Sequence, residues 1–264
     1  MASVLNKDQK QAINKIFKTY NDNNIKYVIL RRHERLPETI PGRNSKKLDL
    51  DLLISSEDFN TAVKLANMNG FNKQTASTTI RTLVQESLQN PTDAVAELTG
   101  NFTESMNRLA DVMKEPMASS KTYYEIACES NYSYKLTSHN LILDIKNHLN
   151  HVSPMHGNRW RLAPTVEQQM LIHREKRNDF YKPSPPDELA HIISHCIFEY
   201  KGKFTEYYSQ RCDYLIEKMD SDDWERFEKI LADIYFEASE IVLTGVNSRN
   251  YDDIRPRLRR YSDY

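Results

Sequence analysis

The sequence predicts an α+β protein with a mixed β-sheet, flanking helices and a C-terminal helical domain. Short β-branched or leucine-rich runs alternate with helical patterns over residues 1–160, which favours a sheet packed against helices. From residue 161 onward the apolar periodicity is helical. The chain has 264 residues, 39% of them hydrophobic, which suffices for one large domain or two small ones. We therefore expect one domain over 1–160 and a second over 161–264.

The first elements are expected in the order helix, strand, loop, strand, helix. Apolar residues recur at helical spacing over 7–21, and β-branched and aromatic residues fill 25–30. A polar loop then leads to a leucine-rich strand at 48–54. The next helix covers about 58–70, where Asn69-Gly70 provides a C-terminal cap.

Helical periodicity continues through 75–120, which we expect to be an insertion in the first domain. Three further strands are expected at 123–128, 132–136 and 141–145. Pro164 is typical of a helix start. The helices expected after it cover about 165–178, 186–200, 204–219, 221–236 and 237–245.

Two acidic residues, Asp49 and Asp51, interrupt the leucine-rich strand 48–54. Residues two apart on a strand point to the same face, so both carboxylates project side by side. Two such charges repel each other, and a divalent cation relieves the repulsion. Mg²⁺ prefers oxygen ligands of this kind, together with substrate phosphates. The alternative is an edge strand with one face in water, where acids alternating with leucines are ordinary.

Asp144 stands alone in the apolar run Leu141–Ile145. A lone acid in such a run needs a partner or a function. If this strand lies beside 48–54, three carboxylates converge and can bridge two metal ions. The alternative is an acid at a strand end that caps a turn or pairs with Lys146.

These motifs resemble the nucleotidyltransferase (DNA polymerase β-like) superfamily, and more narrowly its stand-alone bacterial and archaeal members. The matching segments are Tyr27–Arg31, Leu36-Pro37, Leu48–Ile54, Gly70-Phe71 and Asp144, with Pro164–Tyr208 resembling the helical half. The resemblance implies a nucleotidyltransferase-like mixed sheet. It also implies Mg²⁺-dependent (or Mn²⁺-dependent) transfer of a nucleoside monophosphate from an NTP donor such as ATP to a hydroxyl or phosphate acceptor, with pyrophosphate release. In that scheme Asp49 and Asp51 hold the metals, and Asp144 completes one site and orients the acceptor.

The sequence departs from the family pattern after its first strand, where Arg31-Arg32 replaces the usual Gly-Ser. Arginine forks suit phosphate oxygens, so both arginines are candidate nucleotide-binding residues. Lys47, before the acidic strand, and Lys201, beside Gly202, are two more. The alternative for each of these four residues is a solvated loop position.

Several histidines lie near these motifs. His191 and His195 have the i, i+4 spacing of a helical zinc pair, but no HExxH motif or third ligand accompanies them. A packed histidine face is therefore the favoured interpretation. His148, His151 and His156 follow Asp144 and are candidates for an acceptor-side base or a substrate contact.

Composition narrows the function classes. The formal net charge of -1 argues against binding of long nucleic acids by bulk electrostatics, so a small-molecule acceptor is favoured; the arginine-rich stretch 249–260 leaves RNA open. The six glycines form no P-loop or GxGxxG motif, which counts against kinases and dinucleotide enzymes.

No signal peptide or membrane-spanning run is evident, and the three cysteines are widely spaced, so we expect a cytoplasmic protein. The oligomeric state stays open.

Two other functions remain possible from the sequence. The Asp-x-Asp motif also occurs in glycosyltransferases that bind Mn²⁺ and a nucleotide sugar, although only 48 residues precede Asp49. Such enzymes usually place a larger nucleotide-binding half before the motif. Alternatively, the chain is a catalytically silent nucleotide-binding or regulatory module, for example half of a toxin–antitoxin pair.

Overall fold

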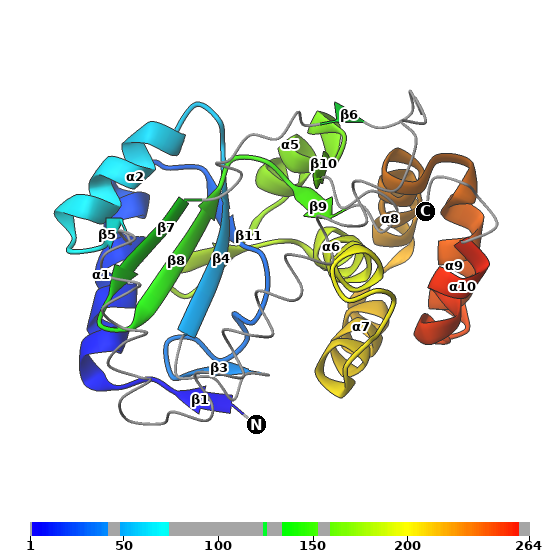
Figure 1. Ribbon diagram of the computed structural model, residues 1–264, viewed down its shortest axis with the longest axis horizontal. Coiled ribbons are helices and arrows are strands. Elements are labelled where there is room, and N and C mark those ends of the chain that lie inside the picture. Colours follow the sequence, from blue (N-terminus) through cyan, green and yellow to red (C-terminus); the bar gives the residue numbers. More distant parts are fainter. Residues whose placement is uncertain (1, 42–47, 74–123, 126–133, 153–158, 259–264) are drawn as a thin grey trace, which may run out of the picture.

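The computed structural model describes residues 2–41, 48–73, 124–125, 134–152 and 159–258. It confirms the α+β class, with a mixed sheet and flanking helices in the first half and a helical region in the second (Figure 1). The expected insertion 75–120 lies outside these residues, as do parts of the expected strands at 123–128 and 132–136. The domain boundary at 160/161 stays a prediction. Among the described helices, none is long and apolar enough to cross a bilayer.

The main sheet has five strands in the order β2-β4-β8-β7-β5. These are β2 (Tyr27–Ile29), β4 (Leu48–Ile54), β5 (Asn72–Lys73), β7 (Tyr134–Ser138) and β8 (Leu141–Lys146). β4 pairs with β8 in parallel, and the other pairs are antiparallel. β4 therefore lies inside the sheet, which excludes the solvated edge strand that the sequence left open.

The two faces of β4 contact different halves of the molecule. Leu48, Leu50 and Leu52 are buried against helices α1 (Lys7–Asp22) and α2 (Phe59–Met68), which begin and end close to their predicted positions. Leu53 points to the opposite face and belongs to the core of the helical region. Asp49 and Asp51 share the face of Leu53, so the alternation of the strand directs both acids toward the helical half.

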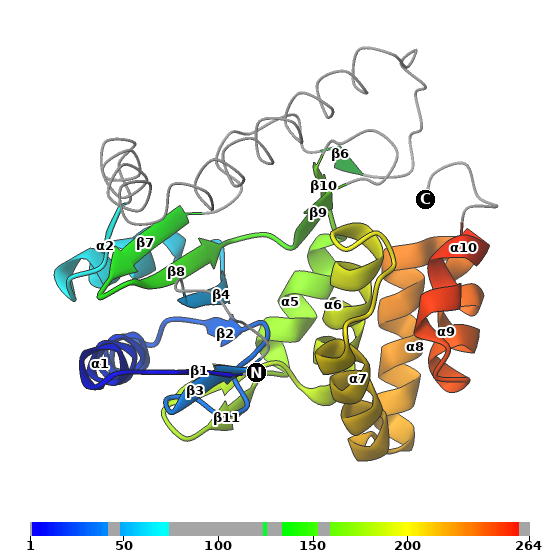
Figure 2. The ribbon, with the colours of Figure 1, turned by 60° about the horizontal axis from the view of Figure 1, so that its bottom comes forward.

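The helical half is built around α6, which is buried along most of its length. It packs against α7 and α8, as Figure 2 shows. The helices are α5 (Pro164–Ile172), α6 (Pro185–Phe198), α7 (Glu206–Lys218), α8 (Ser221–Tyr235), α9 (Ser239–Asn247) and α10 (Ile254–Leu258). The smaller strands are β1 (Ala2–Val4), β3 (Thr39–Pro41), β6 (Tyr124–Glu125), β9 (Asn150–Val152) and β10 (Arg159–Arg161).

The expected helix 165–178 is wrong in its second half. α5 ends at Ile172, and residues 175–182 form a hairpin of β11 (Glu175–Arg177) and β12 (Phe180–Lys182). Asn178 adopts a left-handed conformation (φ 51°) at the turn, as short hairpins require. The hairpin packs back onto the first half of the chain, where the Phe180 ring lies 6.0 Å from that of Phe17.

Candidate active site

Three carboxylates converge on one face of the sheet. The parallel register pairs Asp51 directly with Asp144, and Asp49 lies two residues before Asp51 on the same face. All three line one cavity of about 200 Å³ between the sheet and the helical half, hereafter the carboxylate cavity. Its other lining residues are Leu30, Arg31, Lys135, Lys146, Leu149, Asn150, His151, His191, His195 and Glu199. The predicted adjacency of the two acidic strands is thus present in the structure.

Basic side chains lie beside two of these acids, Asp51 and Asp144. Arg31, just after β2, donates from Nε to Oδ2 of Asp51 at 2.8 Å. Nζ of Lys146 lies 3.7 Å from Oδ1 of Asp51 and 3.8 Å from Oδ2 of Asp144. Burial would raise the pKa of Asp51, but the charges of Arg31 and Lys146 outweigh that effect and hold it well below its usual range. Asp51 is therefore ionised at neutral pH.

Three buried histidines form the opposite wall. His151 comes from β9, whereas His191 and His195 come from consecutive turns of α6; their ring centroids lie 6.0 to 6.5 Å apart. Burial, followed by the charges of Arg31 and Lys146, lowers the pKa of His191 to about 3. Burial and Arg31 also lower the pKa of His195 well below its usual value. Both rings are therefore neutral.

His195 accordingly accepts a hydrogen bond at Nε2 from Nη1 of Arg31. The sequence pointed to the i, i+4 pair His191 and His195, but gave no reason to place it beside the acids. Both rings are buried, as a packed histidine face requires, but they also line the carboxylate cavity.

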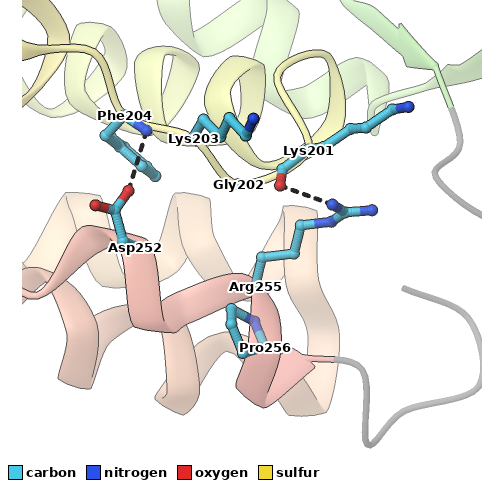
Figure 3. Close-up of a pocket in the computed structure, with 7 residues that line it drawn as sticks. All are labelled: Lys201, Gly202, Lys203, Phe204, Asp252, Arg255 and Pro256. Atoms are coloured by element: carbon cyan, nitrogen blue, oxygen red, sulfur yellow. Dashed lines mark hydrogen bonds between the residues drawn. The ribbon is translucent and has the colours of Figure 1, made fainter.

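Arg32 and Lys201 do not line the carboxylate cavity. Arg32 is buried in a left-handed conformation (φ 62°), donates to the hydroxyl of Tyr208 at 3.2 Å, and stacks on the rings of Tyr207 and Tyr208. Lys201 lines a second cavity at the turn after α6 (Figure 3). Lys47 lies outside the described residues. Of the three expected nucleotide-binding residues that the structure describes, Arg31 alone lies beside the three acids.

A buried ion cluster holds the segment that carries Arg31 against the helices. Arg211 of α7 donates two hydrogen bonds to Glu188 of α6, at 2.7 and 2.8 Å, and its Nε lies 3.3 Å from Oε1 of Glu34. Nε2 of His33 lies 3.3 Å from Glu188, and the Tyr207 hydroxyl donates to Glu34 at 2.7 Å. Burial opposes ionisation of Glu188, but His33 and Arg211 lower its pKa to about 2. The cluster fixes the backbone from which Arg31 reaches Asp51.

The carboxylate cavity offers the oxygen donors that Mg²⁺ and Mn²⁺ prefer. Oδ1 of Asp144 and Nδ1 of His191 are buried without a hydrogen-bond partner among the described residues. A bound ligand could therefore satisfy Asp144, which fits the expected metal chemistry. No three acids, histidines or cysteines in the described ranges are already arranged around one metal position. A cation binding to Asp51 would have to compete with Arg31 and Lys146.

Comparison with known proteins gives little further guidance. No family model matches the chain, and no curated protein matches it in sequence. Among solved structures, the chain is similar to the antibiotic-resistance factor ANT(2″)-Ia, with 10% sequence identity and a TM-score of 0.41. The match covers 84% of this chain and 90% of that one. A likeness at this level identifies neither a family nor an activity.

Proposed function

We propose that this protein is a metal-dependent nucleotidyltransferase. The observation that carries the proposal is the convergence of Asp49, Asp51 and Asp144, from two adjacent parallel strands, in one cavity. Three acids placed together in this way are suited to divalent cations and to phosphoryl chemistry. The substrates would be an NTP and a small acceptor with a hydroxyl or phosphate group. The acceptor oxygen would form a bond to the α-phosphorus, the α–β anhydride bond would break, and pyrophosphate would leave.

Each residue of the cavity has a role in this scheme. Asp49 and Asp51 would hold Mg²⁺ or Mn²⁺, which when bound would offset negative charge on the transferring phosphate. Asp144, whose Oδ1 has no hydrogen-bond partner in the described residues, would accept the hydrogen bond of the acceptor hydroxyl and orient it. Arg31 would contact phosphate oxygens, since its planar fork suits them.

The carboxylate cavity, of about 200 Å³, would take the transferring phosphates and the acceptor hydroxyl. The neutral imidazoles of His191 and His195 would shield the reacting groups from water without adding charge.

One observation favours a second candidate, a silent nucleotide-binding module. Arg31 and Lys146 already pair with Asp51, so protein side chains balance the charge of that carboxylate. A protein that had lost catalysis could retain this arrangement and still bind nucleotides through Arg31. The two candidates differ in turnover, because only the transferase releases pyrophosphate.

Calorimetric titration with each NTP, with and without Mg²⁺, tests the proposal, together with pyrophosphate release in the presence of candidate acceptors. The variant Asp49→Asn/Asp51→Asn keeps side-chain volume and removes both charges. We expect metal-dependent binding of at least one NTP, and a loss of turnover of roughly a thousandfold in the variant. Glu228→Gln, an exposed position on α8, is the matched control.

Each result distinguishes the candidates. Metal-dependent binding with turnover supports the transferase, and binding without turnover for any acceptor supports the silent module. Failure of all four NTPs to bind, with or without metal, would contradict both.

A further inference from the structure

A second cavity lies at the turn between α6 and α7, on the side that faces α10 (Figure 3). Its volume is about 420 Å³, and none of its lining residues lines the carboxylate cavity. The turn contributes residues 201–204, and the C-terminal part of the chain contributes Asp252, Arg255 and Pro256. We call it the turn cavity. The sequence placed Lys201 among the nucleotide-binding residues, and the structure gives it this separate location.

The walls of the turn cavity are held by specific contacts. Lys201 and Gly202 both adopt left-handed conformations (φ 55° and 79°), and Gly202 donates to the carbonyl of Cys196 at 2.9 Å. A Cβ on Gly202 would lie 2.6 Å from Cβ of Arg255, so α10 packs directly on the turn. Nη1 of Arg255 donates to the carbonyl of Lys201 at 2.7 Å. The positions of turn and helix are thus fixed relative to each other.

The charges of the turn cavity are unbalanced. Three of its lining residues are cationic, Lys201, Lys203 and Arg255, and one is acidic. That acid, Asp252, accepts a hydrogen bond from the backbone of Phe204 at 3.2 Å. Neither lysine forms an ion pair within the described ranges. Because the whole chain has 36 basic and 37 acidic residues, two exposed lysines without an acidic partner in the described residues are a local excess of positive charge.

The lining residues indicate what kind of anion would fit. In Figure 3 the side chains of Lys201 and Arg255 extend toward the same side of the turn. An arginine fork beside a lysine ammonium suits phosphate, which accepts several hydrogen bonds and carries up to two charges. Phe204 and Pro256 add an apolar wall. The volume lies within the range of small-ligand sites, so more than a bare phosphate can enter.

We propose that the turn cavity binds the phosphate group of a small phosphorylated ligand of the nucleotide class, at a site distinct from the carboxylate cavity. Lys201 and Lys203 supply point charges, and Arg255 supplies directional donors. The apolar wall of Phe204 and Pro256 contacts the ring system attached to the phosphate. A free nucleotide and the 5′ end of a nucleic acid share this chemistry. The proposal does not depend on the transferase activity.

Calorimetry of the full-length chain at low salt, without divalent metal, tests the site with inorganic phosphate, AMP and a 5′-phosphorylated oligonucleotide. Lys201→Gln/Lys203→Gln removes two charges and keeps side-chain length. We expect AMP to bind more tightly than inorganic phosphate, and the double variant to weaken AMP binding about tenfold or more. Lys18→Gln/Lys229→Gln alters two exposed lysines elsewhere and should leave affinity unchanged. Thermal unfolding of both variants should match that of the wild type.

The location of the site is tested in the Arg31→Met variant, which removes the phosphate contact proposed for the carboxylate cavity and should bind AMP as the wild type does. Tighter binding of the oligonucleotide than of AMP would overturn the assignment to a small ligand. Absence of phosphate and AMP binding, or binding that survives loss of both lysines, would overturn the proposal. Loss of AMP binding in the Arg31 variant would place the ligand in the carboxylate cavity and overturn the proposal as well.

Discussion

The carboxylate cavity and the turn cavity handle charge in opposite ways. In the first, the side chains of Asp51, Arg31 and Lys146 are at most 17% exposed and pair with one another. In the second, Lys201 and Lys203 are exposed and have no acidic partner in the described residues. Buried charges lose solvation and must pair within the protein, whereas water stabilises exposed ones. A ligand that binds Asp51 must therefore displace protein contacts, whereas a ligand that binds Lys201 and Lys203 displaces water from them.

The largest effect is expected where burial is most complete, in the ion cluster around Glu188. Arg211→Met removes both hydrogen bonds to a carboxylate with no exposed surface, and should lower the free energy of unfolding by about 3 to 5 kcal/mol. Lys229→Met breaks an exposed pair with Glu225 and should lower the free energy of unfolding far less, because water and salt screen that pair. Chemical denaturation of both variants gives the comparison.

A second variant at the same cluster serves as its control. Arg211→Met/Glu188→Gln also removes the buried carboxylate charge that has lost Arg211, and should recover part of the lost stability. Equal costs for the buried and the exposed single variants would contradict the contrast between buried and exposed charges.

The next effect concerns the glycine that brings the turn cavity together. Gly202→Ala forces an alanine into a left-handed conformation and places its Cβ 2.6 Å from Cβ of Arg255. We therefore expect the free energy of unfolding to fall by about 2 to 4 kcal/mol. Gly70→Ala carries the same conformational strain (φ 85°), but its Cβ would lie 3.9 Å from Oγ of Ser138, an ordinary contact distance. The free energy of unfolding of the Gly70 variant should fall by only about 1 kcal/mol. Thermal unfolding compares the stabilities of the two variants. Equal stability would mean that α10 can move away from the turn at little energetic cost.

The convergence of the acids was predictable because it depends on local rules. Alternation along a strand places Asp49 and Asp51 on one face, and the lone Asp144 in an apolar strand indicates a third acid nearby. Only the pairing of β4 with β8 had to be assumed, and the register of Asp51 with Asp144 bears that assumption out.

The histidine wall was not predictable, because it depends on how α6 packs against a sheet formed much earlier in the chain. Arg31 and His195, which contact each other, are 164 residues apart. The separation of Lys201 from the acids depends on the same packing.

The hairpin 175–182 was missed for a local reason. Its strands have three residues each, and charged residues dominate β11, so the Asn178-Asp179 turn was the main signal.

The neutral histidines of the carboxylate cavity predict an acid-sensitive fold. The folded-state pKa of His191, about 3, lies below the unfolded value of about 6.5. Below pH 6.5 the unfolded chain therefore binds a proton that the folded chain does not, and stability falls as the pH falls toward 3. Between about pH 6.5 and pH 3, each such histidine lowers the free energy of unfolding by about 1.4 kcal/mol for every unit that the pH falls.

Denaturation between pH 7 and pH 4.5 tests this expectation. Asp51, whose pKa is lowered, loses its stabilising contribution only below about pH 4 and does not interfere. The groups that act most on His191 are Arg31, Lys146, Asp51 and Glu188. His191→Gln should flatten the pH dependence by about one proton, whereas the exposed His173→Gln should leave it unchanged. An unchanged slope in the His191 variant would mean that this ring is protonated in the folded state.

The smallest effect separates the two neighbouring arginines. Arg31→Met removes a cation that competes for Asp51, so Mn²⁺ alone should bind roughly tenfold more tightly, as measured by calorimetry. Arg32→Met should leave Mn²⁺ affinity unchanged and lower stability, because Arg32 is buried against Tyr207 and Tyr208. If Arg31→Met instead left metal affinity unchanged and weakened only NTP binding, Arg31 would be a phosphate ligand that does not compete with metal. Asp49 and Asp144 would then bind the cation without Asp51, and the carboxylate cavity would need fewer displaced contacts than its buried pairs imply.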